Sequence, residues 1–469
     1  MSLADLFYAS AGQHARRLAV TDVRSGRALT YGALAEEADR VAAFLGGQGV
    51  RPAHRIALMS PNGLAYLPAA FGLLAAGACV VPLSSHLAAP EVAQILSEMN
   101  VNAALWAPGA NPLSMDRGRR SMSGGACDGF SFEWIDRHAE GPADLGRLDP
   151  AFIRFTSGTT ARSKGVVLSH DATVARVEAA DRVLRFTAED RIVWVLPLAY
   201  HFAVTIVAYV RAGAHILMCP DTLPRSVLDI ARRFEATVLY ASPFHFERLG
   251  NLGPGDALKS LRLAVSTSAP ITEAVTQRFE AAYGVPVAQA YGIIEAGLPC
   301  INVRTDGLPP TSVGRPVPGY EVAVFSDEIA VRGSGLFSAY YAPWQPREQV
   351  TRDGWFFTGD VGRLDASGAL HLLGRKKTVI FVAGVKFFPE EVEDCINRFV
   401  GIRESRVFGE PHPRLGQVPR AEIVLTGDAC DAGALAAHCA RALSSYKVPL
   451  DFTVVPAIAK TPGGKILRR

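Results

Sequence analysis

The stretch FTSGTTARSKGVVLSH, residues 155–170, contains the residue types that point most directly to chemistry. It places Thr and Ser hydroxyls and a glycine ahead of Lys164. Backbone N–H groups of a Gly-containing turn, side-chain hydroxyls and a lysine ammonium are the donors that polyphosphate oxygens require. We therefore predict a phosphate-binding loop between the strand-like runs 151–155 and 165–170. The alternative interpretation is a polar surface turn.

The loop does not follow the Walker A pattern. GxxxxGK[ST] requires Gly at 163 and Ser or Thr at 165. This chain has Ser163 and Gly165 instead. Phosphates bound here must therefore be held by a different design.

The bulk composition is that of a globular enzyme with more than one core. The chain has 469 residues, of which 49% are hydrophobic and 20% charged, with a net charge of +3. This length predicts two or three domains, and the small net charge argues against nucleic-acid or membrane partners. Seven cysteines show no CxxC or paired-His spacing, which fits buried thiols, and the N-terminus lacks a secretory signal pattern. We expect a cytoplasmic protein with small-molecule partners.

The elements that position the loop follow an α/β pattern. From about residue 50 to 300, strand-like apolar runs alternate with helical patterns, which predicts largely parallel sheets. The uncharged run 66–83 contains Pro and Gly and is interpreted as a buried helix and strand, not a membrane span. Residues 107–149 read as a long excursion, and 300–372 as a small β-rich unit. A new α+β pattern follows residue 377.

Five separated motifs resemble those of the acyl- and amino-acid-adenylating superfamily, which includes acyl-CoA synthetases, luciferases and non-ribosomal peptide adenylation domains. Residues 156–165 are similar to its SGTTGxPKG loop. The other four motifs are AYGIIEAG (290–297), GWFFTGDVG (354–362), GRKKTVIFVAGVKFFPEEVE (374–393) and KTPGGKILRR (460–469). The resemblance implies an N-terminal domain (1–373) of mostly parallel sheets plus a β-rich unit, a hinge (374–377) and a mobile α+β C-terminal lid (378–469).

The resemblance also implies an ATP- and Mg²⁺-dependent ligase that adenylates a carboxylic acid. Three residues would be catalytic. Lys465 would lie between the acid's carboxylate and the α-phosphate, Glu295 would bind Mg²⁺, and Lys164 would hold the β- and γ-phosphates. Asp360, a two-oxygen acceptor, would bind the ribose hydroxyls with help from Arg375. The other nucleotide-binding residues would be Thr156, Ser157, Gly158, Thr159, Thr160, Ser268, Ala269, Pro270, Ala290, Tyr291, Gly292 and Ile293.

The resemblance further implies that the acyl group passes to a thiol, either of coenzyme A or of a carrier-protein phosphopantetheine. The C-terminal lid would turn about Lys377 between the two half-reactions. One alternative is transfer of the acyl-adenylate to a non-thiol acceptor. Another is a non-catalytic nucleotide or acyl sensor, which is disfavoured because Lys465, Glu295 and Asp360 are all present.

The stretch LPLAYHFAVT, residues 196–205, bears on the identity of the acid. In amino-acid-activating relatives the matching stretch carries an Asp that pairs with the substrate's ammonium. Here it has no carboxylate, so α-amino acids should be poor substrates. The predicted pocket residues are Tyr200, His201, Phe202, Ser242, Ser266 and Ser268. They favour a compact aryl or short acyl acid; alternatively His201 is a packed core residue and the pocket takes a longer fatty acid.

Some positions depart from the superfamily's pattern. Ala161 and Ser163 replace a Gly and a Pro of the loop, and Ile294 replaces a Thr. The sequence STSAP (266–270) replaces the commoner GGAP. None of these changes removes a charged catalytic group. We therefore expect them to affect rate and specificity rather than the class of reaction.

Overall fold

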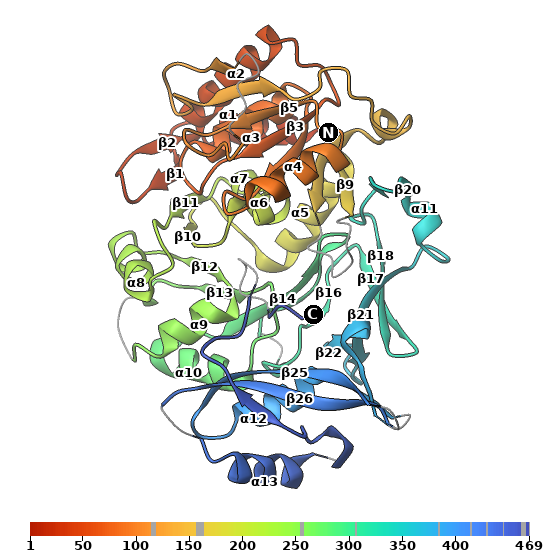
Figure 1. Ribbon diagram of the computed structural model, residues 1–469. Helices are drawn as coiled ribbons and strands as arrows, with labels where there is room; N and C mark the ends of the chain where they lie inside the picture. Colours follow the sequence, from red (N-terminus) through yellow and green to blue (C-terminus); the bar gives the residue numbers. More distant parts are fainter. Residues whose placement is uncertain are drawn as a thin grey trace.

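The computed structural model describes most of the chain. The described residues are 1–113, 119–155, 164–253, 258–304, 307–382, 385–412, 415–427, 430–443, 445–460 and 466–468. They form two large sheets, a smaller antiparallel sheet and a separate C-terminal domain (Figure 1). The predicted α/β class with a large N-terminal and a small C-terminal part is confirmed.

The first sheet has nine strands in the order β20-β19-β9-β8-β4-β3-β5-β7-β6. Their bounds are β3 Arg55–Met59, β4 Cys79–Leu83, β5 Ala103–Trp106, β6 Arg120–Ser121, β7 Ser131–Trp134, β8 Pro150–Phe155, β9 Gly165–Ser169, β19 Ala339–Tyr340 and β20 Gln345–Pro346. Strands β8, β4, β3 and β5 run parallel, whereas β9 returns antiparallel to β8. Because β8 and β9 flank residues 156–163, the predicted phosphate loop joins two paired central strands.

The second sheet also has nine strands, in the order β16-β15-β14-β13-β12-β10-β11-β1-β2. Their bounds are β1 Leu18–Asp22, β2 Ala28–Thr30, β10 Arg191–Trp194, β11 His215–Met218, β12 Val238–Ala241, β13 Leu263–Ser266, β14 Val287–Ile293, β15 Gly297–Asn302 and β16 Arg315–Pro316. The six strands from β14 to β1 are mutually parallel. Their carboxyl ends therefore meet at one edge, which is where ligands bind in open α/β sheets.

The helices of the N-terminal part fill the space between the two sheets and cover their outer faces. Their bounds are α1 Leu3–Gln13, α2 Tyr31–Gly47, α3 Tyr66–Ala75, α4 Ala89–Glu98, α5 His170–Leu184, α6 Leu198–His201, α7 Val207–Arg211, α8 Pro224–Arg233, α9 Pro243–Gly250, α10 Glu273–Tyr283 and α11 Arg347–Val350. Side chains of α1, α2, α3, α5 and α7 share one hydrophobic core with both sheets. Helix α4 packs in a second core on the other face of the first sheet.

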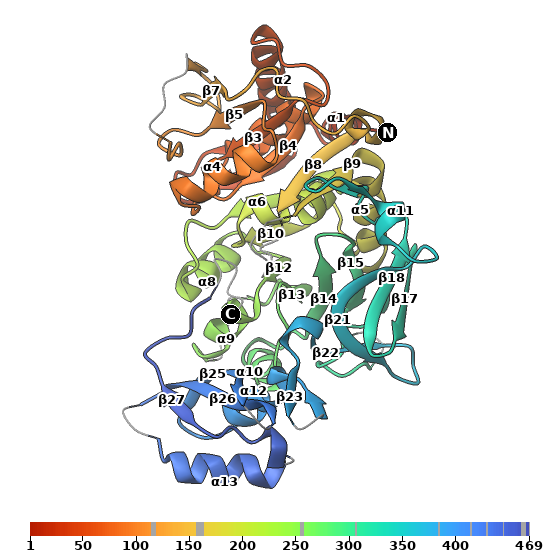
Figure 2. The ribbon, with the colours of Figure 1, turned by 45° about the vertical axis from the view of Figure 1, so that its right-hand side comes forward.

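The third sheet is antiparallel, with the order β17-β18-β21-β22. Its strands are β17 Tyr320–Phe325, β18 Glu328–Gly333, β21 Phe356–Leu364 and β22 Leu370–Arg375. The C-terminal domain follows β22 and lies below the second sheet in both ribbon views (Figures 1 and 2). It contains β23 Ile380–Val382, β24 Val385–Phe387, α12 Pro389–Asn397, β25 Ile402–His412, β26 Gly416–Leu425, α13 Ala432–Ala442 and β27 Phe452–Val454, with a hydrophobic core of its own.

Two interpretations of local sequence can be checked against these elements. The uncharged run 66–83 forms α3 and β4 inside the core, as predicted, and no helix in the described ranges is long and apolar enough to cross a bilayer. Residues 107–149 are less of an excursion than expected. Strand β7 (SFEW), whose polar and apolar residues alternate as in a strand, pairs antiparallel with β5 on one side and with β6 on the other.

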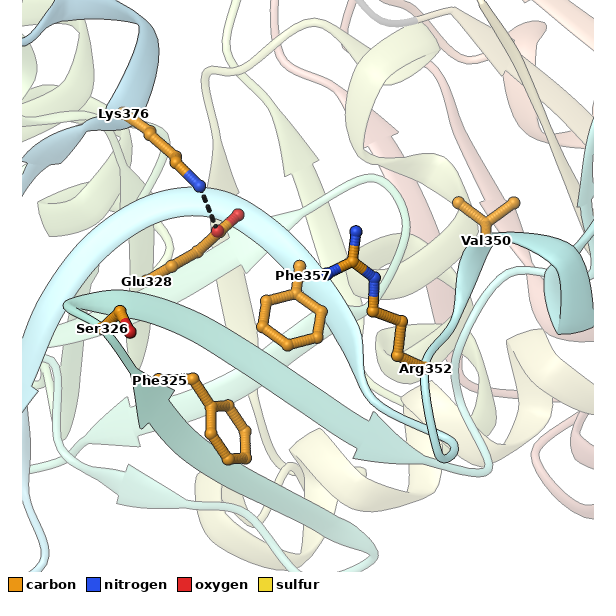
Figure 3. Close-up of a pocket in the computed structure, with 7 residues that line it drawn as sticks. All are labelled: Phe325, Ser326, Glu328, Val350, Arg352, Phe357 and Lys376. Atoms are coloured by element: carbon orange, nitrogen blue, oxygen red, sulfur yellow. Dashed lines mark hydrogen bonds and ion pairs between the residues drawn. The ribbon is translucent and has the colours of Figure 1, made fainter.

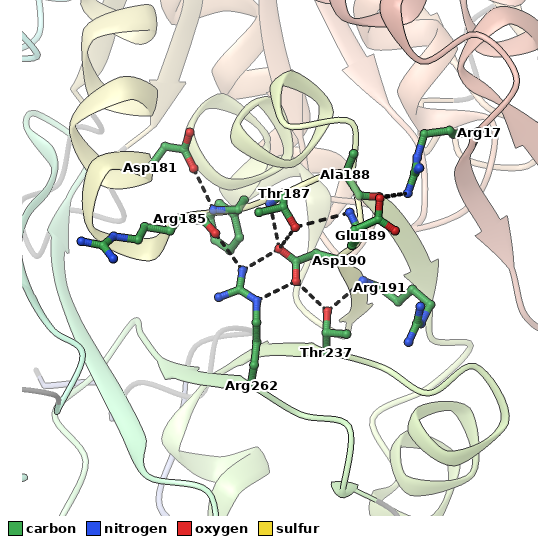
Figure 4. Close-up of polar contacts among 11 residues, drawn as sticks. Arg17, Asp181, Arg185, Thr187, Ala188, Glu189, Asp190, Arg191, Thr237 and Arg262 are labelled. Carbon is green, nitrogen blue, oxygen red and sulfur yellow. Dashed lines mark hydrogen bonds and ion pairs between the residues drawn. The ribbon is translucent and has the colours of Figure 1, made fainter.

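A polar network ties together the amino-terminal ends of the parallel strands in the second sheet (Figure 4). Asp190, 2% exposed, precedes β10 and accepts hydrogen bonds from the Thr187 N–H at 2.8 Å and the Thr237 hydroxyl at 2.7 Å. Arg262, which precedes β13, donates its Nε to Asp190 at 2.8 Å. Since the network lies at the edge opposite the carboxyl ends of these strands, we assign it a structural role.

Candidate active site

The first part of the site is a carboxylate held between two donors. Tyr291 lies near the end of β14 and donates its hydroxyl to Oδ2 of Asp360 at 2.7 Å. Arg375, paired with Asp360 across β21 and β22, donates Nε to Oδ1 at 2.7 Å. Burial, followed by the Asp360 carboxylate, raises the pKa of Tyr291 well above its ordinary value, so the phenol keeps its proton. Tyr291, predicted apart from Asp360 and Arg375, therefore joins them in one unit.

The second part brings Glu295 and Lys164 together through a residue that the sequence did not single out. Tyr340 of β19 donates its hydroxyl to Oε1 of Glu295 at 2.9 Å. Nζ of Lys164, the residue before β9, lies 4.6 Å from the centre of the Tyr340 ring. Burial, followed by the charge of Glu295, raises the pKa of the Tyr340 hydroxyl, which thus remains a donor. Tyr340 thus contacts two of the three predicted catalytic residues.

The backbone under Glu295 is fixed by a buried arginine. Arg176 of α5 is 1% exposed and donates Nη1 to the carbonyl of Ile294 at 2.8 Å and Nη2 to the carbonyl of Glu295 at 2.6 Å. Its Nε donates to the carbonyl of Gly335. Three charge-assisted bonds to backbone therefore hold the turn after β14 against the segment that leads to β19.

The AYG motif has glycine at position 292 for a steric reason. A Cβ on Gly292 would lie 2.8 Å from a Leu298 methyl carbon and 2.9 Å from the Gly297 carbonyl oxygen. Any larger residue would therefore push apart β14 and β15, which pair at this point. Ala290 and Ile293 belong to the same strand, beside Tyr291. This close pairing places Tyr291 and Glu295 at the same end of β14.

Two of the predicted acid-binding residues pack against buried aromatic rings. The His201 ring lies edge-on to Trp194 at 5.7 Å and to Tyr240 at 6.3 Å, and the rings of Trp194 and Tyr240 stack at 6.0 Å. Trp194 and Tyr240 belong to the main core, at the carboxyl ends of β10 and β12, and we call them, with His201, the aromatic wall. Phe202 is 2% exposed and packs against Phe71 at 5.1 Å within the same core. Tyr200 is half-buried beside His201.

The predicted serines lie at the ends of adjacent strands. Ser242 follows β12, and its buried hydroxyl is 2.8 Å from Nδ1 of His245. Ser266 ends β13 and is 2% exposed. Ser268 has a φ of +75°, a left-handed conformation that residues other than Gly rarely adopt, so the turn carrying Ala269 and Pro270 is sharply bent. All three serines lie at or just after carboxyl ends of parallel strands, as Tyr291 and Glu295 do.

Comparison with known proteins decides the family. The AMP-binding enzyme family matches residues 7–341, and the AMP-binding enzyme C-terminal domain matches residues 391–465. The chain belongs to the AMP-binding enzyme family. A 3-[(3aS,4S,7aS)-7a-methyl-1,5-dioxo-octahydro-1H-inden-4-yl]propanoyl:CoA ligase of Rhodococcus jostii is 30% identical, over 94% of this chain and 92% of that protein. A sulfoacetate–CoA ligase of Cupriavidus necator is 29% identical, over 95% and 92%.

A solved structure of this AMP-binding family agrees over the same length. ATP-bound MatB from Rhodopseudomonas palustris superposes with a TM-score of 0.86 at 26% identity, covering 99% of this chain and 97% of that one. The apo form of MatB superposes on this chain with a TM-score of 0.76. The overall arrangement of this chain is therefore more similar to the ATP-bound than to the apo structure. Together, the family match and these relatives show that the protein is an ATP-dependent ligase of the type that adenylates a carboxylic acid and transfers it to coenzyme A.

Some residues predicted from the family motifs lie outside the described part of the chain. They are Thr156, Ser157, Gly158, Thr159, Thr160 and Lys465, together with the side chain of Lys377. Their roles stay predictions. Ile466 and Arg468, which lie within the described residues, make several contacts. Ile466 forms a β-bridge with Lys460, and Arg468 donates to Glu393 at 2.7 Å and forms an ion pair with Glu390 at 3.2 Å.

A cavity of about 530 Å³ lies apart from these groups, on the third sheet (Figure 3). Phe325, Phe357 and Arg352 line it, and Lys376 is paired with Glu328 at 2.8 Å on one side. Its lining includes none of the residues that the resemblance assigns to the nucleotide, the metal or the acid. We therefore place the candidate active site at the carboxyl ends of β10, β12, β13 and β14 instead.

Sequence reasoning missed Tyr340, Arg176, Trp194 and Tyr240. The first two gain their meaning from contacts between segments far apart in the chain, and no local pattern marks them. Trp194 and Tyr240 had a weak signal, because each is an aromatic residue near the carboxyl end of a predicted parallel strand.

Proposed function

We propose that this enzyme adenylates a compact aryl or short acyl acid and passes it to the thiol of coenzyme A. The observation that carries the proposal is the convergence of Asp360 and Glu295. Tyr291, bonded to Asp360, lies four residues before Glu295 at the end of β14. A ribose-binding carboxylate and a metal-binding carboxylate would thus stand on the two sides of one bound nucleotide.

In this proposal the acid's carboxylate oxygen attacks the α-phosphorus of ATP, and pyrophosphate leaves with the bond's electron pair. Lys164 would neutralise the departing phosphates, and Lys465 the charge that develops at the α-phosphoryl group. Asp360 would hold the ribose, and the hydrogen bonds from Tyr291 and Arg375 would orient that carboxylate. Positioning and cation placement would supply most of the catalysis.

The residues around Glu295 fit a magnesium ion. One carboxylate oxygen accepts from Tyr340, and the other has no protein donor among the described residues. Mg²⁺ is commonly held by one or two carboxylates together with substrate phosphates, so a cluster of protein ligands is not required. When bound, the ion would neutralise charge on the phosphate oxygens.

The size of the acid is inferred from the aromatic wall. The buried rings of Trp194 and Tyr240 stack at 6.0 Å, and the half-buried His201 ring lies edge-on to Trp194. Such a wall suits a planar or short acid and limits the length of an alkyl chain.

The test is a pyrophosphate-release panel of benzoates, cinnamates, fatty acids of increasing length and the standard amino acids, with and without coenzyme A. We expect the highest kcat/KM for a compact acid and thioester formation that requires the thiol. Trp194→Ala should shift the preference toward longer acids, with Trp194→Phe as the matched control. A best substrate of twelve or more carbons in the unmodified enzyme would contradict the assigned acid class, and preference for an amino acid would contradict the reading of residues 196–205.

A further inference from the structure

Arg154 is a buried cation that the proposed mechanism does not yet use. It lies one residue before the end of β8 and is 9% exposed. Its Nη2 donates to the carbonyl of Tyr200, and this is its hydrogen bond to the described residues. No carboxylate forms an ion pair with it in the described part of the chain. A buried guanidinium with so few partners costs free energy unless an anion meets it.

The contrast with Arg176 shows that burial alone does not explain Arg154. Arg176 is 1% exposed, but its donors reach three backbone carbonyls. Arg154 makes one hydrogen bond to the described residues instead. Burial, followed by the nearby Arg176, lowers the pKa of Arg154 to about 10, which leaves it charged at neutral pH.

The position of Arg154 joins the two sides of the candidate site. Through Tyr200 it contacts α6, which carries His201 of the acid-side wall. The Glu295 carboxylate lies close enough to favour the charged form of Arg154. In the sequence, its strand is followed by residues 156–163, the predicted phosphate loop. Arg154 is therefore near Tyr200, assigned to the acid, and near Glu295, assigned to the metal ion of the nucleotide.

We propose that Arg154 binds the oxyanion at this junction, formed by the α-phosphoryl group of the nucleotide and the carboxylate of the acid. This inference rests on the proposed function, since it names a further catalytic residue for the same reaction. A guanidinium offers several donors in a fixed plane and can contact oxygens of both reacting groups. The hydrogen bond to the Tyr200 carbonyl would fix the orientation of the guanidinium, and the bound anion would accept its remaining hydrogen bonds.

The test compares adenosine with AMP, which differ in the α-phosphoryl group. Affinities are measured by calorimetry for the unmodified protein, Arg154→Met and Arg154→Lys. Charge-assisted hydrogen bonds are stronger than neutral ones. Arg154→Met should therefore weaken the affinity for AMP by about ten- to a hundredfold and leave the affinity for adenosine within about twofold. Arg154→Lys keeps the charge and one donor nitrogen, so its affinity for AMP should lie between those of the unmodified protein and Arg154→Met. It serves as the test variant if the Met variant does not fold.

Pyrophosphate release with the best acid separates the two sources of the oxyanion. A rise of tenfold or more in the acid's KM with unchanged AMP affinity would assign Arg154 to the carboxylate, which also supports the inference. Equal changes for adenosine and AMP, or no change in AMP affinity and acid KM, would overturn it and leave Arg154 a structural link to α6. If the unmodified protein binds no AMP and releases no pyrophosphate with any acid, the proposed function itself fails.

Discussion

Tyr340 offers two separable perturbations of the catalytic centre. Tyr340→Phe removes the hydroxyl that bonds Glu295 at 2.9 Å but keeps the ring beneath Lys164. A hydrogen bond to a charged group contributes about 1.5–3 kcal/mol, which corresponds to roughly ten- to a hundredfold. Since that bond orients one carboxylate oxygen of Glu295, its loss should appear in the metal requirement. Tyr340→Leu additionally removes the cation–π contact, which is worth about 0.5–1 kcal/mol at exposed sites, or roughly two- to fivefold.

The assay is pyrophosphate release at saturating ATP and acid, with Mg²⁺ varied. Tyr340→Phe should raise the Mg²⁺ concentration for half-maximal rate by at least about tenfold, and Tyr340→Leu should also raise the KM for ATP. Tyr341→Phe is the matched control, because Tyr341 packs in the separate core on the other face of the first sheet. If Tyr340→Phe keeps both the Mg²⁺ requirement and kcat within twofold, its hydroxyl does not orient Glu295.

Three further outcomes follow from other groups. Lys465→Ala should slow adenylation about a thousandfold, or roughly 4 kcal/mol, in pyrophosphate release, while conversion of a synthetic acyl-adenylate to thioester survives; a loss below tenfold would refute the role. Arg262→Met removes an ion pair from buried Asp190 and should lower the free energy of unfolding by about 3 kcal/mol in urea titration, with KM values unchanged as the check on its structural role. Burial lowers the pKa of His215 from 6.5 to about 4, so the unfolded chain takes up the proton first and the free energy of unfolding should fall as pH drops from 6.5 toward 4. His215→Gln should flatten that part of the curve, and an unchanged slope would exclude His215 as its source.

The sequence predicted the architecture and the pairing of Asp360 with Arg375, because ordered motifs carry both. The structure adds what motifs cannot contain, namely contacts between distant segments. Tyr340 belongs to none of the five motifs. Its strand β19 pairs with β9, however, and this places its ring close to Lys164. Arg154 did have a local signal, since a charged residue inside the apolar strand AFIRF is unusual.

The assignment of Tyr200, His201 and Phe202 to the acid pocket stays a prediction. His201 and Phe202 are neighbours in the chain, but the helical backbone there directs them differently. The His201 ring contacts Trp194 and Tyr240, whereas the Phe202 ring packs against Phe71. Residues that follow different strands can share a pocket, while residues adjacent on one helix need not.

The separate core of the C-terminal domain has a consequence for recombination. Its buried side chains, from Ile380 to Cys439, come from within that domain, and a single strand end at Arg375 leads into it. A crossover placed in residues 374–377 would exchange a complete hydrophobic core together with the segment that carries Lys465. Gly374 must be retained in such a chimera, because a Cβ there would lie 2.7 Å from the Phe388 ring. In gene fusions between relatives, the N-terminal part, which is proposed to select the acid, and the C-terminal part, which carries Lys465, could thus be exchanged independently.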